Sequence, residues 1–366
     1  MNIYTATLIH KNYGSMLQAY ALQNCLRSYG ATPYIIIEKD GANRSKLRRL
    51  ISGLLSDIIY ILKPDKDYSL FMRLKLVIDD YKFGEKYKKI NSFIKDKLTI
   101  INILNEEEFL RTIPSDSLFL AGSDQVWNSP SKLPWYAFQW VKNNSNKYSY
   151  AASVALSSMN KEQQKIYIEY LSPFKTISLR EEQSFNFFKP VFADKVRHDL
   201  DPTLLYDKSF WRKIESPRLI SEPYIFVYRL RPNKDVFELA RRVAKEKKCK
   251  IVYTGSYACR ANDIHTIYNA GAEDFLSYID HAEAIVTNSF HGTAFSIIYE
   301  KQFLSAKVAT TGSRAESLLS ILDLKSQFIE DPHGDYSLKV DYTKVNDILK
   351  QEREKSLEYL NKICSN

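Results

Sequence analysis

The stretch AEAIVTNSFHGTAFSIIYEKQ, residues 282–302, carries the pattern that decides the fold. An apolar strand is predicted to end at Thr287, and a helix is predicted to begin near Gly292. A short polar turn that contains a histidine, His291, joins the two. A strand that leads through a short turn into a helix is the repeating unit of parallel α/β sheets.

The same alternation runs through both halves of the chain. In the first half, the apolar strand NIYTATLI leads to a helix, MLQAYALQNCLRSYG, that Gly30 is expected to stop, and the strand YIIIE follows. A second series begins near residue 220 with EPYIFVYRL, KDVFELARRVAKEKKC and KIVYTG. We therefore predict an α/β protein with two Rossmann-like domains facing a cleft. The expected parts are a first domain over 1–210, a second over 220–340 and a closing helix over 342–363.

A basic segment interrupts the first domain. Residues 44–105 are helical in pattern and rich in Lys, Arg and bulky apolar residues, and KLRRLISGLLSDIIYILK (46–63) combines a basic start with a broad apolar face. One interpretation is an amphipathic helix that lies on an anionic membrane. The other is a helix packed on its own domain with its basic ends in water.

Composition narrows the class of protein. The chain has 366 residues, of which 45% are hydrophobic, so it is long enough for two cores. A net charge of +9 suits phosphorylated substrates, anionic lipid or nucleic acid, but no nucleic-acid-binding motif is present. The four scattered cysteines are typical of reduced thiols in a cytoplasmic protein. With neither a signal peptide nor a long apolar run, we expect a cytoplasmic protein, with peripheral contact at the inner face of the membrane left open.

The turn that contains His291 has the features of an anion site. A helix N-terminus offers free N–H groups and partial positive charge, and an imidazole there can exchange a proton near neutral pH. Asn288 or Ser289 could cap the helix, and Gly292 would allow close approach of a ligand. The alternative is a capping turn with a partly buried histidine.

Two further turns follow predicted strands. In AGSDQVWN (121–128), Ser123 could present its N–H to an anion, Asp124 could bind a sugar hydroxyl or act as a base, and Trp127 could stack on a sugar. The alternative is an Asp cap and a core tryptophan. In HKNYGSMLQ, Gly14 and Ser15 open the first helix, but the turn lacks the dinucleotide-binding glycine pattern.

Arginines complete the candidate site. Each follows a strand or opens a helix, and a guanidinium binds phosphate or carboxylate through two parallel hydrogen bonds. A single arginine is usually a solvated surface residue, so it is the joint placement that favours an anion clamp. No metal-binding motif is present, and no metal is expected. The four arginines are Arg180, Arg229, Arg231 and Arg314.

Taken in order, these turns resemble the polysaccharide pyruvyl transferase family over residues 12 to about 324. The resemblance implies a glycosyltransferase-B-like pair of domains that transfers a pyruvyl group from phosphoenolpyruvate to sugar hydroxyls during cell-surface polysaccharide assembly. It implies no cofactor beyond phosphoenolpyruvate as co-substrate, and a sugar or lipid-linked oligosaccharide as acceptor. The matching stretches are NYGSMLQAYALQ, AGSDQVWN, YAASVA, SLREEQSF, DPTLLYD, TNSFHGTAFSIIYEKQF and RAESLLSILDL.

The resemblance also gives the candidate residues their roles. His291 fits the role of general acid or base, and Arg180 and Arg229 fit the role of an anion clamp for the donor. Asp124 would bind the acceptor or act as a base. Arg231 and Arg314 are reserve cations. Members of the family often carry an arginine where this chain has Ser289, which removes a cation that would contact the donor.

Two other functions compete with pyruvyl transfer. A glycosyltransferase of the same fold would use a nucleotide-sugar, bound in the second domain between the TGSYACR and SFHG turns. A non-catalytic scaffold of a polysaccharide assembly complex would tolerate loss of His291.

Overall fold

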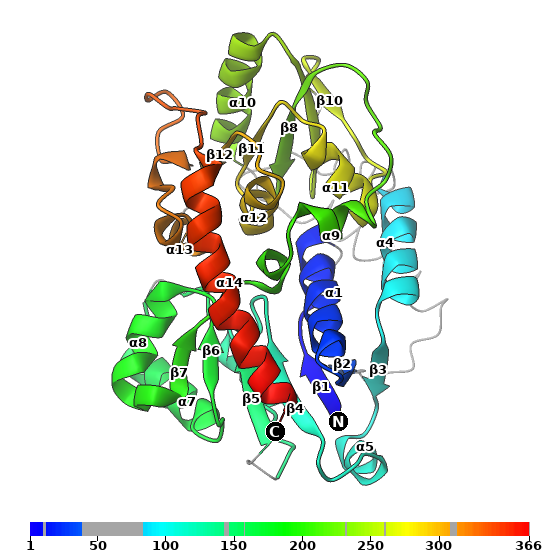
Figure 1. Cartoon of the computed structure of the whole chain (residues 1–366), viewed down its shortest axis with the longest axis vertical. Coiled ribbons are helices and arrows are strands. Elements are labelled where there is room, and N and C mark those ends of the chain that lie inside the picture. Colours follow the sequence, from blue (N-terminus) through cyan, green and yellow to red (C-terminus); the bar gives the residue numbers. More distant parts are fainter. Residues whose placement is uncertain are drawn as a thin grey trace, which may run out of the picture.

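The computed structural model describes residues 1–9, 12–38, 83–142, 146–156, 158–230, 233–259, 261–307 and 313–365. The basic helix expected over 46–63 lies outside these residues, as does Arg231. The chain forms two parallel sheets, one above the other in Figure 1, with helices packed around them.

The first sheet has the strand order β3-β2-β1-β4-β5 and is parallel throughout. A second parallel pair of strands, β6-β7, continues this sheet beyond β5. Two isolated bridges join them, one between Tyr148 and Thr176 and one between Ala152 and Leu179. The strands are β1 (Asn2–Ala6), β2 (Thr32–Glu38), β3 (Ile100–Ile103), β4 (Leu118–Gly122), β5 (Lys147–Tyr150), β6 (Ile177–Leu179) and β7 (Val196–His198). The helices are α1 (Tyr13–Ser28), α4 (Gly84–Lys97), α5 (Glu106–Thr112), α6 (Leu133–Tyr136), α7 (Lys161–Leu171) and α8 (Glu182–Phe192), with short 3₁₀ turns η1 (Pro130–Lys132), η3 (Ala193–Lys195) and η4 (Pro202–Leu205).

The second sheet has the strand order β10-β9-β8-β11-β12-β13 and is also parallel. Its strands are β8 (Tyr224–Arg229), β9 (Lys250–Gly255), β10 (Ile264–Thr266), β11 (Ala284–Thr287), β12 (Phe303–Ala306) and β13 (Phe328–Ile329). The helices are α9 (Lys208–Arg212), α10 (Lys234–Lys247), α11 (Ala272–Asp280), α12 (Phe290–Ile298), α13 (Ser313–Ile321) and α14 (Tyr342–Cys364), with the 3₁₀ turn η5 (Lys325–Gln327).

Local sequence explains most of these elements. The central strands β1, β4, β8 and β11 are almost entirely buried, as expected for short apolar runs covered on both faces. Helix α1 ends where predicted, because Gly30 adopts a φ of 80°, which side chains with a Cβ rarely reach.

The helical expectation over 44–105 is wrong at its C-terminal end. Residues Ile100–Ile103 form strand β3, which pairs with β2 at the edge of the first sheet. The run TIINIL is rich in β-branched side chains, which favour a strand, and it follows a helix of only 14 residues.

The carboxyl ends of the two sheets face each other. Tyr13, at the start of α1, donates a hydrogen bond to the carbonyl oxygen of Ala270 at 3.1 Å, and its hydroxyl lies 3.3 Å from that of Thr254 at the end of β9. Helix α14 crosses back from the second domain to the first, where Tyr359 donates to the carbonyl oxygen of Ser149 (Figure 1). The fold is therefore the predicted pair of Rossmann-like domains in a glycosyltransferase-B-like arrangement.

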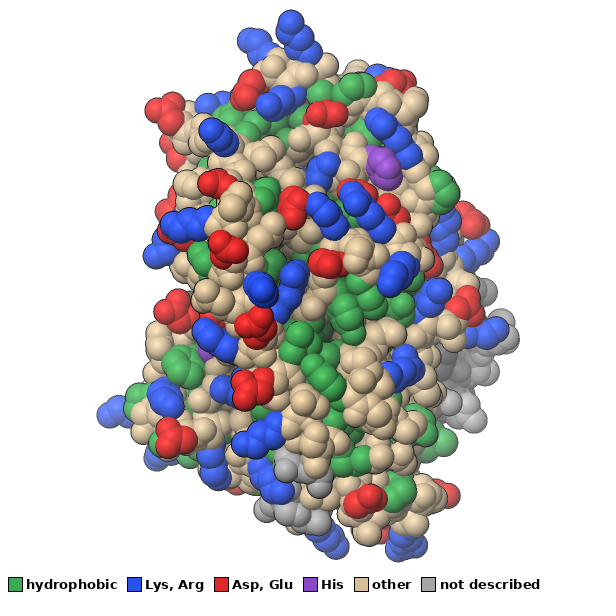
Figure 2. Space-filling model, viewed as in Figure 1, with side chains coloured by type: hydrophobic (Ala, Val, Ile, Leu, Met, Phe, Trp, Pro, Cys, Tyr) green, Lys and Arg blue, Asp and Glu red, His purple; other side chains and the backbone are tan. Residues whose placement is uncertain are grey.

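Charge is dispersed over the face shown in Figure 2. Lysine and arginine side chains cover it from end to end and alternate with acidic ones, so the net charge of +9 makes no single basic patch on this side. Among the described residues, no helix combines the length and apolar character required to span a bilayer.

Candidate active site

His291 lies in the first turn of α12, at the carboxyl end of β11, as the sequence predicted. Ser289 caps the helix by accepting a hydrogen bond from the N–H of Gly292 at 3.3 Å. A Cβ on Gly292 would lie 2.2 Å from the hydroxyl oxygen of Thr287, so only glycine lets the helix start this close to the strand. The turn thus places His291 with only 5% of its surface exposed. Asn288 accepts a hydrogen bond from the N–H of Leu230 and so ties this turn to the end of β8.

The first domain packs directly on the imidazole. Gly14, in the first turn of α1, approaches so closely that a Cβ there would lie 2.1 Å from Nδ1 of His291. Ser15 is buried beside it and donates its N–H to Asn12, the cap of α1. The two helix N-termini therefore meet at His291, one from each domain.

Asp201 is the centre of the polar contacts around this histidine. Its Oδ2 accepts hydrogen bonds from Nη1 of Arg180 at 2.7 Å and from the hydroxyl of Ser123 at 3.0 Å, and it lies 3.7 Å from Nε2 of His291. Its Oδ1 accepts from the N–H and hydroxyl of Thr203. A fully buried carboxylate of the first domain thus faces the histidine of the second.

These contacts keep Asp201 ionised. Burial alone would raise its pKa, but the imidazole of His291, the guanidinium of Arg180 and the N–H of Thr203 together hold the pKa well below its usual range.

Arg180 is surrounded by acids. Besides Asp201, its guanidinium lies 3.6 Å from a carboxylate oxygen of Asp124 and 3.5 Å from one of Glu181, and it stacks on the ring of Phe290 at 4.4 Å. Asp124 has a φ of 62°, a left-handed conformation that is uncommon for residues other than glycine. Three buried carboxylates therefore share one guanidinium.

Several buried atoms in this cluster make no hydrogen bond to any part of the chain that the structure describes. They are Nε2 of His291, Nε and Nη2 of Arg180, and Oε1 of Glu181. Buried polar groups are nearly always hydrogen-bonded in folded proteins. Their convergence marks this cluster as the candidate ligand site.

The other predicted cations are placed differently. We call Arg180, its three carboxylates and His291 the Arg180 cluster. Arg229 ends β8, and its guanidinium stacks on Phe237 of α10. Arg314 opens α13, one turn before Ser317, whose hydroxyl accepts the N–H of Glu182 next to that cluster. Arg180 therefore contacts α12 through Phe290 and Arg229 contacts α10 through Phe237, and the joint clamp of arginines stays a prediction.

The expectation that Trp127 stacks on a sugar is wrong for this conformation. Its side chain is 0% exposed, packs edge-on against Phe174, and donates its indole N–H to the carbonyl oxygen of Tyr136. The core interpretation of this tryptophan therefore holds.

Sequence reasoning assigned no role to Asp201 or Glu181. Asp201 begins the DPTLLYD stretch, and an acidic residue before proline in an otherwise apolar run is the signal that could have drawn attention to it. Glu181 follows Arg180 in SLREEQSF, where nothing local distinguishes it from the exposed Glu182.

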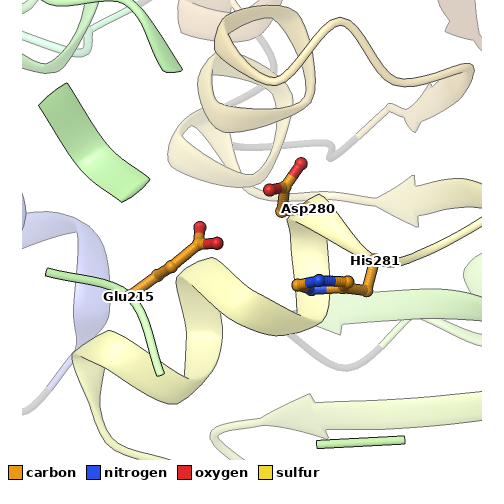
Figure 3. A group of neighbouring side chains, drawn as sticks. All are labelled: Glu215, Asp280 and His281. Atoms are coloured by element: carbon orange, nitrogen blue, oxygen red, sulfur yellow. The ribbon is translucent and has the colours of Figure 1, made fainter. Parts of the chain in front are cut away.

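One group of described side chains has metal-ligand spacing, and it lies apart from this cluster. Glu215, Asp280 and His281 bring their ligand atoms within 4.8 Å of one another (Figure 3). Asp280 already accepts two hydrogen bonds from Arg212, and Glu215 accepts one from Tyr299. These partners make the group an ion-pair network that fastens α9 to α11.

A search of solved structures finds similar chains at low identity. The UDP-GlcNAc 2-epimerase of Methanocaldococcus jannaschii has a TM-score of 0.49 at 9% identity, covering 96% of this chain and 92% of its own. The UDP-N-acetylglucosamine 2-epimerase of Rickettsia bellii has a TM-score of 0.48 at 13% identity, covering 99% and 98%. That of Neisseria meningitidis, bound to UDP-GlcNAc, has a TM-score of 0.46 at 11% identity, covering 100% and 94%. A search of curated proteins finds no match.

A family model gives the more specific result. The model described as polysaccharide pyruvyl transferase matches residues 12–306, well over half of the 366-residue chain. This range contains both helix N-termini that meet at His291, together with Arg180 and Asp201. The chain therefore belongs to the polysaccharide pyruvyl transferase family.

Proposed function

We propose that this protein transfers a pyruvyl group from phosphoenolpyruvate to two hydroxyls of a sugar, forming a ketal, in the assembly of cell-surface polysaccharide. The observation that carries the proposal is the buried imidazole of His291 at a helix N-terminus. Its Nε2 makes no hydrogen bond to any described residue, and it faces an ionised carboxylate supplied by the other domain. Family membership supports the same reaction class.

The reaction needs a proton donor first. In the proposed mechanism, Nε2 of His291 gives its proton to the methylene carbon of phosphoenolpyruvate, and C2 becomes electrophilic. A sugar hydroxyl forms a C–O bond to C2 and gives up its proton, after which the C–O bond to phosphate breaks and inorganic phosphate leaves. A second hydroxyl of the same sugar then attacks C2 and closes the ketal, and its proton returns to Nε2 of His291. Proton transfer by a positioned side chain typically contributes about 10²- to 10⁴-fold to the rate.

The surrounding residues fit supporting roles in this mechanism. Asp201, 3.7 Å from Nε2, is placed to hold the imidazole in position for the first step. Asp124, at the edge of the cluster, is the candidate to accept the proton of the attacking hydroxyl. Ser289 supplies only a hydroxyl at the N-terminus of α12. In the proposed mechanism, the partial positive charge of this helix end faces the leaving phosphate instead of an arginine.

The test is release of inorganic phosphate from phosphoenolpyruvate in the presence of sugar acceptors. A panel of methyl glycosides and of lipid-linked oligosaccharides serves as acceptors, and wild type is compared with His291→Asn. The exposed histidine of β10 provides the matched control, His265→Asn. We expect turnover in wild type and control and a loss of about 10²-fold or more in His291→Asn.

Thermal shifts with phosphoenolpyruvate, UDP and GDP complete the test, since a ligand that binds only the folded state raises its stability. Stabilisation by a nucleotide alone, with no phosphate release from phosphoenolpyruvate, would replace this proposal with a glycosyltransferase. Unchanged turnover in His291→Asn would remove His291 from the mechanism.

A further inference from the structure

Contacts between the two domains close His291 off from solvent. Only 5% of this residue is exposed, and its Nε2 is buried with no hydrogen-bond partner in the described part of the chain. Gly14 of α1 lies so close that a Cβ there would be 2.1 Å from Nδ1. A substrate that contacts Nε2 therefore requires the domains to separate, and the contacts that hold them together control access.

The C-terminal half of α4 is fixed to the first domain. Ile90 and Phe93 are buried, and the ring of Phe93 packs edge-on against that of Tyr20 in α1. Directly after the helix, Ile100–Ile103 forms the edge strand β3 of the first sheet.

The N-terminal half of α4 contacts the second domain instead. The ammonium of Lys86 donates a hydrogen bond to the carbonyl oxygen of Gly255 at 2.8 Å. One turn later, the ammonium of Lys89 lies 2.7 Å from a carboxylate oxygen of Asp274 in α11. A Cβ on Gly271, the residue before α11, would lie 3.0 Å from the Cβ of Lys89. Helix α4 therefore bridges the two domains.

This bridge lies away from the point where the chain itself crosses between the domains. Figure 1 shows α4 and α14 on opposite sides of α1. Helix α14 is continuous chain, whereas the bridge of α4 to the second domain includes the side-chain contacts of Lys86 and Lys89. Such contacts can break and form again, so that the second domain could pivot about α14.

The charge of Lys86 keeps the bridge from being permanent. The residue is 4% exposed, and its ammonium lies 4.7 Å from the ring centre of Tyr13 and 5.3 Å from that of Phe83. Among the described residues, no carboxylate lies within ion-pair distance of it, although buried lysines are usually paired. Burial lowers its pKa to about 8, so the buried ammonium opposes closure of the domains.

We propose that α4 is a releasable strap between the domains. While Lys86 and Lys89 hold the second domain, the imidazole of His291 stays covered. When these contacts break, the domains separate and His291 is exposed to substrate. The identity of the substrate rests on the proposed function above, whereas the strap does not.

A disulfide between α4 and the second domain tests the strap without any substrate. In the double variant Lys89→Cys/Gly271→Cys, the two Cβ positions need to separate by only about half an ångström to reach disulfide geometry. Diethyl pyrocarbonate modifies accessible imidazoles, and mass spectrometry gives the rate at His291 relative to that at the exposed His265.

We expect His291 to react at one slow rate in wild type, in oxidised wild type and in the reduced double variant. In the oxidised double variant it should react at least about tenfold more slowly, because the opening that exposes it is blocked. Failure of the pair to cross-link, or equal rates before and after oxidation, would overturn the strap.

Single substitutions on α4 provide an independent test with opposite signs. Lys86→Met removes the buried charge, and a pKa lowered from 10.5 to about 8 corresponds to roughly 300-fold against closure, part of which the lost hydrogen bond offsets. This variant should slow modification of His291 by about tenfold or more. Lys89→Ala should speed it about two- to fivefold, as for loss of a partly exposed salt bridge.

Lys88→Met is the matched control, because Lys88 is exposed on the same helix and pairs with Glu85, and it should leave the rate unchanged. Faster modification in Lys86→Met, or equal rates in Lys89→Ala and Lys88→Met, would contradict the strap.

Phosphate release from phosphoenolpyruvate in the same samples separates the strap from the proposed function. We expect the cross-link to abolish turnover and a reductant to restore it. Protection of His291 by the cross-link without phosphate release in any sample would leave the strap intact and refute the proposed function. Unchanged turnover and unchanged modification after cross-linking would refute the strap alone.

Discussion

Replacing Gly14 with alanine tests whether the contact between the two domains positions His291. The added Cβ would lie 2.1 Å from Nδ1, 2.2 Å from Cγ and 2.7 Å from Cβ of His291. Rotation of the imidazole cannot relieve this overlap, because the Cβ of His291 is itself too close. Either α1 must move away from α12, or the whole histidine must shift.

The magnitude follows from two opposing effects. Alanine in place of glycine favours a helix by at most about 1 kcal/mol, and less near a helix end. Forcing an extra methyl group into a packed contact costs about 1–3 kcal/mol. We therefore expect Gly14→Ala to lower the free energy of unfolding by up to about 3 kcal/mol. Activity should fall further, by about 10²-fold or more, because the proposed proton donor is displaced.

The assays are urea unfolding and phosphate release from phosphoenolpyruvate. Gly84→Ala is the matched control, because a Cβ there meets no atom within 4 Å, and it should change neither quantity by much. A Gly14→Ala protein that is as stable and as active as Gly84→Ala would refute the claim that this contact fixes the position of the imidazole.

Three further predictions concern buried groups. Asp201→Asn should lower the free energy of unfolding by about 3–5 kcal/mol, because Arg180 loses a buried charged partner. Since the folded-state pKa of Asp201 is depressed, this difference should persist from neutral pH to about pH 4 and shrink only in stronger acid, which urea unfolding at several pH values would show. For Lys86→Met, the stability difference from wild type should change at high pH instead. The folded-state pKa of Lys86, about 8, lies below the ordinary 10.5. As pH rises between those values, wild type should therefore gain roughly 3 kcal/mol of stability relative to the variant. Trp127→Ala should cost about 3–5 kcal/mol of stability, whereas Trp127→Phe should leave KM for the acceptor unchanged, and a large rise in that KM would restore a substrate role for this residue.

Local patterns were sufficient to predict the alternation of strands and helices that opens each half and the turn that contains His291. They failed at Ile100–Ile103, where a β-branched run was assigned to the preceding helix. They also could not show which of four arginines meet, because this depends on which face of a strand or helix packs inward. Arg180 and Arg229 both follow apolar strands, yet only Arg180 contacts the acids near His291.

The burial of Lys86 could have been predicted from the sequence. It lies in a segment with many lysines, so composition gives no reason to single it out. However, Lys86, Ile90 and Phe93 are spaced by four and then three residues, and they are the three buried positions of α4. A lysine on the apolar face of an amphipathic helix is the signal. What that face contacts, the carbonyl oxygen of Gly255 in the other domain, depends on tertiary structure alone.

The path of α14 has a consequence for synthesis on the ribosome. Its last turns supply Tyr359, Leu360 and Ile363 to a core that also contains Ile3 of β1 and Leu120 of β4. These residues leave the exit tunnel only after the whole second domain has been translated. The first domain, although translated first, therefore leaves part of its apolar core uncovered until α14 is made. We expect the nascent chain to depend on chaperones until α14 emerges.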